Sequence, residues 1–192
     1  TTKKTPHLHI AGMHPADKGI ELHGDRKTKK VFWLQNGSNH YFKDLSPENF
    51  NLLKEAFLKQ PNAYKFISSI HTDIESQVEL YTYYMYGDLD GTPDIIDGKL
   101  SAPENFRDSL DCPSLLWNNK NITIDNYNLK AREIVIIDMM LQNIPDKAIW
   151  DALKLSESHF NTVKRNLLHN TNCSSSKELI IKSILQKVML NS

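Results

Sequence analysis

The side chains best suited to binding a ligand lie along residues 156–170, near the end of the 192-residue chain. At about 100° per residue in a helix, Phe160, Val163 and Leu167 form one apolar stripe. Polar residues occupy the opposite side and its flanks; they are Ser158, Asn161, Thr162, Lys164, Arg165 and His169. Such side chains hydrogen-bond to base edges and phosphates, so this face predicts contact with DNA. Any solvated helix face is also polar, so the face alone leaves both interpretations open.

No pattern in the chain indicates catalytic chemistry. The sequence contains no nucleophile motif, no glycine-rich phosphate loop and no paired cluster of metal ligands. Histidines are scattered, and nothing orients one such as His71 to act as a base. An enzyme is therefore disfavoured, and no cofactor is expected.

Two other patterns resemble metal sites but do not match one. Four acids recur around Gly91; they are Asp88, Asp90, Asp94 and Asp97. An EF-hand loop needs a different spacing, with glutamate at its twelfth position, so we expect an acidic surface turn. His7 and His9 would share one face of a strand and could hold a metal, but solvated surface histidines are the expectation because no supporting ligand lies nearby.

The polar face must be positioned by the helices around it. The apolar pattern of the last 64 residues predicts four short amphipathic helices. They span residues 129–142, 145–154, 156–170 and 175–190. Asn143 suits a left-handed helix end, Pro145 a helix start and Ser156 an N-cap. Only Lys154-Leu155-Ser156 joins the second helix to the third. This is the spacing of a helix-turn-helix, whose second helix enters the DNA major groove.

Four short motifs occur in order along these helices. They are Leu129-x-x-Arg132-Glu133, Lys147-x-Ile149 with Leu153, Leu155-Ser156-Glu157-Ser158, and Ser175 through Glu178-Leu179. Over about 60 residues and without a gap, the chain thereby resembles the C-terminal DNA-binding domain of LuxR-type (GerE-type) transcription regulators. The resemblance implies a four-helix domain with residues 156–170 in the major groove and DNA contacts at Asn161, Thr162 and Arg165. It also implies a structural role for Glu133, by pairing within the domain or capping backbone amides.

The chain departs from that family's usual residues at four places. Asn161 replaces a lysine, Val163 a histidine, Lys154 the turn glycine, and Thr171-Asn172 a leucine-glycine pair. If Lys154 must be left-handed, the cost is roughly 1–2 kcal/mol. These departures imply a diverged member with a different sequence preference or a weaker intrinsic affinity for DNA.

The first part of the chain predicts a different kind of domain. Asn36-Gly37 predicts a hairpin, and Ser46-Pro47 begins a helix at 47–59. Apolar residues in steps of three or four predict one helix of roughly seven turns over 61–86. Residues 112–128 are expected to be a linker or a short extended segment. The predicted fold is mixed: a small α+β domain at 1–120, with a hairpin and two or three helices, precedes an all-α four-helix helix-turn-helix domain at 121–192.

Amino-acid composition supports DNA binding only weakly. Residues 129–192 contain nine Lys/Arg and six Asp/Glu, a net charge of +3, which is modest for a DNA-binding domain. The sequence shows no apolar run long enough to cross a membrane and no leader, so a cytoplasmic location is expected. Cys112 and Cys173 are expected to be reduced, buried thiols.

The leading hypothesis is a bacterial transcription regulator that binds double-stranded DNA. Lys147 and Lys164 would contact phosphates, while Asn161, Thr162 and Arg165 would contact bases. Two copies on adjacent half-sites would add avidity, so a homodimer is expected, formed through the helix at 61–86. Residues 1–120 lack the patterns of a receiver or a lactone-binding module, and their ligand is not apparent from the sequence.

The alternative hypothesis is a protein-interaction module. Its helix-turn-helix would dock on a partner such as RNA polymerase or another regulator rather than on DNA. Salt dependence separates the two hypotheses, because neutralising phosphates makes binding fall steeply with salt and protein docking need not do so.

Overall fold

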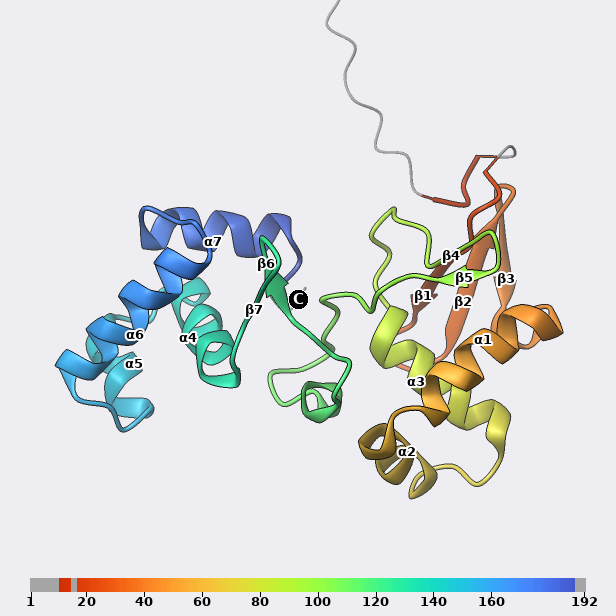
Figure 1. Cartoon of the computed structure of the whole chain (residues 1–192), viewed down its shortest axis with the longest axis horizontal. Helices are drawn as coiled ribbons and strands as arrows, with labels where there is room; N and C mark the ends of the chain where they lie inside the picture. The colour runs from red at the N-terminus through yellow and green to blue at the C-terminus, as the bar shows by residue number, and fades with distance from the viewer. Residues whose placement is uncertain (1–10, 15–16, 189–192) are drawn as a thin grey trace, which may run out of the picture. The chain divides into compact units, whose positions relative to one another are not determined.

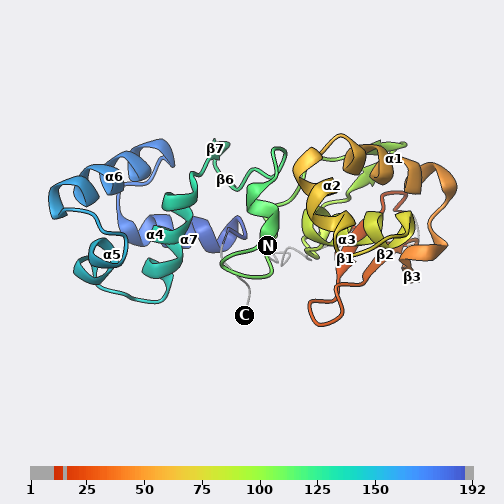
Figure 2. The same ribbon diagram turned by 90° about the horizontal axis from the view of Figure 1, so that it is seen from below.

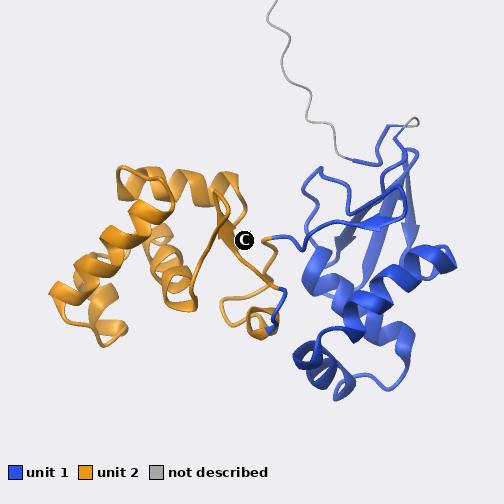
Figure 3. Ribbon diagram, viewed as in Figure 1, with its two compact units in different colours: residues 1–104, 117–119 blue, residues 105–116, 120–192 orange. Residues whose placement is uncertain are grey.

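The computed structural model describes residues 11–14 and 17–188 (Figures 1 and 2). Within them the fold is mixed α/β, with seven α-helices and three small antiparallel sheets. The chain divides into two compact units (Figure 3). Unit 1 comprises Thr1–Glu104 and Trp117–Asn119, and unit 2 comprises Asn105–Leu116 and Lys120–Ser192. Residues 105–116 therefore group with unit 2, whereas the sequence analysis set its boundary at residue 120.

An antiparallel sheet of three strands forms one layer of unit 1, in the order β1-β2-β3. The strands are β1 (Glu21–Gly24), β2 (Val31–Gln35) and β3 (Ser38–Tyr41). The predicted hairpin is confirmed: Asn36 and Gly37 join β2 to β3 with φ of 51° and 75°. Two left-handed residues match the right-handed twist of the strands on either side. Strand β1 was not predicted; it is only four residues long.

Three helices accompany this sheet. They are α1 (Pro47–Leu58), α2 (Pro61–Ser68) and α3 (Ile74–Tyr86). The start of α1 is as predicted, because the Ser46 hydroxyl accepts the Asn49 N–H at 3.3 Å. Helix α3 packs against β1 and β2 and against the other two helices. Two short strands, β4 (Ile95–Ile96) and β5 (Lys99–Leu100), pair with each other, and a 3-10 turn, η1 (Phe42–Asp44), follows β3.

The prediction of one continuous helix over 61–86 is wrong. Helix α2 ends at Ser68, and Asp73 starts α3 by accepting the Ser76 N–H at 2.7 Å. Ile70 and Ile74, which the periodicity placed in an apolar stripe, are 51% and 36% exposed. An aspartate N-cap favours a helix start over helix continuation, and the apolar spacing happens to stay in phase across the break. The long helix expected to mediate dimerisation is therefore absent from the described residues.

Unit 2 begins with irregular chain and a short hairpin. The 3-10 turn η2 (Pro113–Leu116) precedes β6 (Thr123–Ile124) and β7 (Tyr127–Asn128). Asp125 and Asn126 join these two strands with φ of 48° and 65°. The segment expected to be a linker thus contains a hairpin, and it supplies Ile122 and Ile124 to the core of unit 2.

Four helices complete unit 2. They are α4 (Ala131–Leu141), α5 (Asp146–Ala152), α6 (Glu157–Asn170) and α7 (Ser176–Leu185). Helix α4 packs against α5 and α7, and α5 packs against α6 (Figures 1 and 2). Their common core includes Ile137, Ile149, Phe160, Leu167 and Leu179, all fully buried. As predicted, Asn143 ends the first of these helices in a left-handed conformation, with φ of 56°.

A buried ion pair fastens the first residues of unit 2 to its helices. Arg107 is 1% exposed, and its guanidinium donates to both carboxylate oxygens of Asp138, at 3.0 and 2.8 Å. It also donates to the Val188 carbonyl at 2.5 Å. The nearby Asn105 amide donates to the carbonyls of Thr123 and Gln186. These contacts explain why residues 105–116 belong to unit 2.

Two further expectations concern the cysteines and the membrane. Cys112 and Cys173 are both free and buried, as predicted. Among the described residues, no helix has the length and apolar character needed to cross a membrane.

Candidate nucleic-acid interface

The helix that carries the predicted DNA-binding face is held in place at its start and along its inner side. The Ser156 hydroxyl accepts the His159 N–H at 3.3 Å, which confirms the predicted N-cap of α6. Phe160 and Leu167 are fully buried, and Val163 is half-buried beside them. Trp150 of α5 packs against Phe160, with ring centroids 5.8 Å apart. The orientation of α6 is therefore fixed by its apolar stripe.

The outer side of α6 is polar and solvent-exposed. Five of the predicted site residues lie on it, all exposed; they are Ser158, Asn161, Thr162, Arg165 and His169. The Thr162 hydroxyl donates to the Ser158 carbonyl at 3.0 Å and can still accept from a ligand. No hydrogen bond or ion pair joins the Arg165 guanidinium to another of the described residues. Arg165 therefore keeps all its donors available.

The two predicted phosphate-binding lysines differ in their surroundings. Lys147 is exposed in the first turn of α5. Lys164 lies on the flank of α6, with its side chain 20% exposed and its Nζ 2.7 Å from the Asp146 carboxylate. That ion pair joins α6 to the start of α5. Lys164 would have to leave Asp146 to contact a phosphate, so its predicted role in DNA binding stays a prediction.

The turn between α5 and α6 contains a strained residue. Lys154 has φ of 54°, a left-handed conformation that glycine adopts without a Cβ clash. We expect Lys154→Gly to raise the free energy of unfolding by about 1 kcal/mol, because it removes the clash between Cβ and the carbonyl oxygen. Urea denaturation measures this gain. Lys154→Ala is the control, since alanine retains the Cβ; an alanine variant as stable as the glycine variant would contradict the explanation.

Glu133 has the structural role that the sequence predicts. Its side chain is 5% exposed and accepts the Lys130 N–H at 2.8 Å, at the start of α4. The Tyr127 hydroxyl donates to the same carboxylate. The carboxylate therefore caps a free backbone amide and fastens the β6–β7 hairpin to α4.

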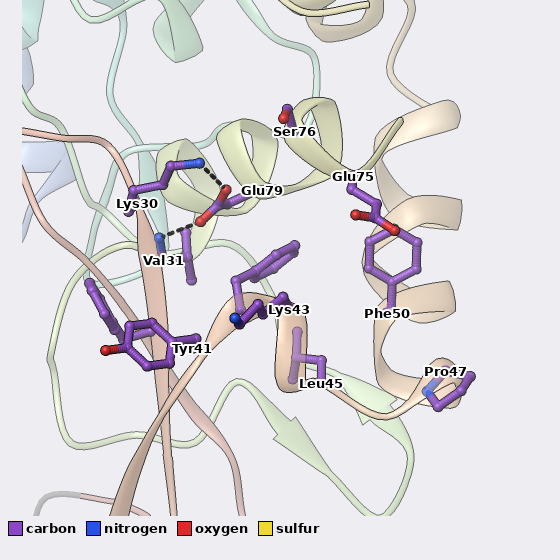
Figure 4. A pocket seen from close by; sticks show the side chains of 12 residues that line it. Lys30, Val31, Tyr41, Lys43, Leu45, Pro47, Phe50, Glu75, Ser76 and Glu79 are labelled. Atoms are coloured by element: carbon purple, nitrogen blue, oxygen red, sulfur yellow. Dashed lines mark hydrogen bonds and ion pairs between the residues drawn. The ribbon is translucent and has the colours of Figure 1, made fainter. Parts of the chain in front are cut away.

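A cavity of about 690 Å³ lies in unit 1 (Figure 4), whereas the predicted site residues all belong to unit 2. Its lining comes from β2, β3, η1, α1 and α3, and includes the aromatic residues Phe32, Tyr41, Phe42 and Phe50. At one wall Glu79 accepts from Lys30 Nζ at 2.7 Å and from the Val31 N–H at 3.1 Å. Such a lining suits a small molecule with an apolar face. No sequence pattern indicates this cavity, because residues from five elements meet only in the folded unit.

Two sequence patterns that resemble metal sites have different outcomes. His7 and His9 lie outside the described residues. The acidic turn is only partly at the surface: Asp97 is exposed, whereas Asp94 is 2% exposed and accepts the Leu22 N–H at 2.8 Å. Asp94 was expected on the surface because it lies among turn residues. It is buried because its carboxylate joins this segment to β1.

Comparison of the chain with protein-family models, with curated proteins and with solved structures finds no match. The resemblance to LuxR-type regulators therefore remains a prediction based on the motifs in the sequence.

Proposed function

We propose that unit 2 is a helix-turn-helix domain that binds double-stranded DNA, with α6 in the major groove. The observation that carries this proposal is the division of α6 into two sides. Its inner side is anchored by Phe160 and Leu167, and its outer side presents Asn161, Thr162, Arg165 and His169 to solvent. A helix held rigidly by its apolar side, with donors and acceptors on the other, is the arrangement by which recognition helices read DNA.

Each exposed side chain has a contact that suits its chemistry. Arg165 can donate two hydrogen bonds to a guanine, and Asn161 can make a bidentate pair with an adenine. Thr162 can contact the methyl group of a thymine or accept from a base. Lys147 supplies a charge for a backbone phosphate, and Lys164 would do so only after leaving Asp146. Base contacts thus outnumber phosphate contacts, so we expect modest affinity in a single domain.

The proposed function of the whole chain is transcription regulation, as a homodimer. Two copies on adjacent half-sites would bind DNA more tightly than one domain alone, through avidity. Unit 1 is proposed to supply the sensory or dimerising role. Because most of α3 between Gln77 and Tyr86 is buried, that part of the predicted 61–86 helix is not available for a dimer interface.

NMR mapping tests where the DNA binds. In the proposed complex, adding a random-sequence duplex to isotope-labelled full chain shifts the amide signals of α6 and the start of α5. Shifts confined to other elements, with α6 unchanged, would contradict the proposal.

Docking on a protein partner such as RNA polymerase is the second candidate function. The ion pair between Lys164 and Asp146 favours this second function, because it occupies a cation that would otherwise face phosphate. Docking on a protein predicts that adding DNA causes no saturable amide shifts.

Restoring the family's lysine should strengthen DNA binding. We expect Asn161→Lys to raise affinity for random-sequence duplex and to steepen the slope of log K against log salt by about one, because one more phosphate is neutralised. Fluorescence anisotropy measures both. Asn170→Lys is the matched control, since it adds the same charge to α6 on the side away from Asn161. Equal gains from both variants would mean that general charge, not the proposed face, governs binding.

A further inference from the structure

Four aromatic rings line the cavity of unit 1, and they form two pairs (Figure 4). Phe32 of β2 and Tyr41 of β3 are cross-strand neighbours, and their ring centroids lie 5.6 Å apart. Phe42 of η1 and Phe50 of α1 meet edge to face, with ring centroids 6.1 Å apart. Aromatic rings pack well against the faces and edges of other rings, so this lining suits a flat apolar ligand.

Three of these rings remain accessible to a ligand. Tyr41 is 62% exposed, and Phe32 and Phe50 are half-buried. The cavity volume of about 690 Å³ lies within the range of small-molecule sites in proteins. The cavity can therefore hold a ligand of the size of a typical drug and place its rings against aromatic side chains.

The lining also contains two lysines and two glutamates, but one of each is already paired. Lys30 Nζ donates to Glu79 at 2.7 Å, and the second oxygen of Glu79 accepts the Val31 N–H. The other cation is Lys43, which is exposed and whose Nζ lies 5.7 Å from the centre of the Tyr41 ring. Within the part of the chain that the structure describes, Lys43 has no carboxylate partner.

The other anion of the lining, Glu75, has a compensation that Lys43 lacks. It lies in the first turn of α3, where the N–H groups at the start of the helix favour a negative charge. Figure 4 shows Glu75 and Phe50 toward one side of the cavity, and Lys43 and Tyr41 toward the other. The charge that a ligand can best compensate is therefore the positive one beside Tyr41.

We propose that this cavity binds a small organic anion, a molecule with a flat ring system and one acidic group such as a carboxylate. The rings of the ligand pack on Phe32, Tyr41 and Phe50, and its acidic group faces Lys43. A hydrogen bond between an ammonium and a carboxylate is stronger than one between neutral groups, which favours an acid over a neutral ligand. The proposal concerns unit 1 alone and is independent of DNA binding by unit 2.

The fluorescent dye anilinonaphthalene sulfonate tests the site in the full chain. It combines apolar rings with one acidic group, and it binds accessible apolar surface. We expect saturable binding of one dye per chain. In isotope-labelled protein, the amide shifts that the dye causes should be confined to the elements that line the cavity, which are β2, β3, η1, α1 and α3. Shifts confined to other elements, or no saturable binding up to millimolar dye, would overturn the proposal.

A series of ligands with the same rings and different charges tests the preference for an anion. Naphthoate, naphthalenemethanol and naphthylmethylamine carry a negative charge, no charge and a positive charge. We expect naphthoate to displace the dye at a concentration about two- to fivefold lower than naphthalenemethanol, and the amine to be the weakest. Displacement that is equal across the series, or strongest for the amine, would overturn the proposal.

Lys43→Gln tests the role of the lysine charge. We expect this variant to weaken naphthoate binding about two- to fivefold and to leave naphthalenemethanol binding unchanged, because only the charge is lost. Lys65→Gln is the matched control, since Lys65 is an exposed lysine of α2 outside the lining. Equal weakening of naphthoate binding by both variants would overturn the assignment of the anion to Lys43.

Tyr41→Leu tests the role of the aromatic lining. We expect it to weaken binding of both naphthoate and naphthalenemethanol about two- to tenfold, because it removes a ring and keeps an apolar side chain. The circular dichroism spectrum should stay unchanged. Tyr64→Leu is the matched control, because Tyr64 is 46% exposed on α2 and lies outside the lining. Equal losses from the two leucine variants would overturn the proposal.

Discussion

Arg107→Ala is expected to destabilise unit 2 by about 3–5 kcal/mol, because it leaves the buried Asp138 carboxylate without its partner. Arg107 is 1% exposed and makes three hydrogen bonds, two to Asp138 and one to the Val188 carbonyl. Small domains are stable by only about 5–15 kcal/mol, so the loss would remove a large share of the stability. Urea unfolding, followed by circular dichroism, should show the transition of unit 2 at a much lower urea concentration.

Two controls separate the buried charge from other effects. Lys59→Ala removes the cation of an exposed ion pair with Glu55, whose side chains are 74% and 70% exposed, and should cost less than about 0.5 kcal/mol. Replacing both buried partners, in Arg107→Met with Asp138→Leu, should recover most of the lost stability because no buried charge remains. A double variant as unstable as Arg107→Ala would show that packing, rather than the unpaired carboxylate, sets the cost.

Arg165→Ala is expected to weaken binding to a duplex selected from a random pool by about 1–3 kcal/mol, roughly five- to 150-fold. The reason is that Arg165 is the one arginine on the exposed side of α6 and can make a bidentate contact with guanine. The variant should also relax sequence preference at one base pair. Competition binding with duplexes that differ at single positions measures both effects.

Arg132→Ala is the matched control for this prediction. It removes the same side chain and the same charge from an exposed position in the first turn of α4. If α6 reads the DNA, Arg132→Ala should change affinity less than about threefold, because Arg132 lies on α4 and not on the proposed reading face of α6. Similar losses for both arginine variants would indicate a general electrostatic effect and would count against a recognition role for α6.

The sequence predicted the parts of the fold that depend on local signals. Ser156 and Asn143 mark helix ends because capping involves residues only a few positions apart, and both act as expected. The hairpin at Asn36-Gly37 is equally local. The break between α2 and α3 was missed because apolar residues stay in phase on both sides of Asp73, so periodicity alone continued the helix through it.

The parts that depend on distant side chains were not predictable in this way. The extent of unit 2 depends on the contacts of Asn105 and Arg107 with residues up to 81 positions away. Helical periodicity correctly put Lys164 on the flank of α6, but it could not show that Asp146 of α5 would bind it. Spacing rules describe one segment at a time, and these contacts join different segments.

The central question is whether the full chain binds duplex DNA through α6. Fluorescence anisotropy with a random-sequence duplex pool, repeated over a range of salt concentrations for wild type and Arg165→Ala, measures this. We predict saturable binding that weakens linearly in log K against log salt, by about 0.9 for each phosphate neutralised, and that is weaker for Arg165→Ala than for wild type. Absence of binding at low salt, or binding that neither salt nor Arg165→Ala changes, would contradict the account and favour docking on a protein partner.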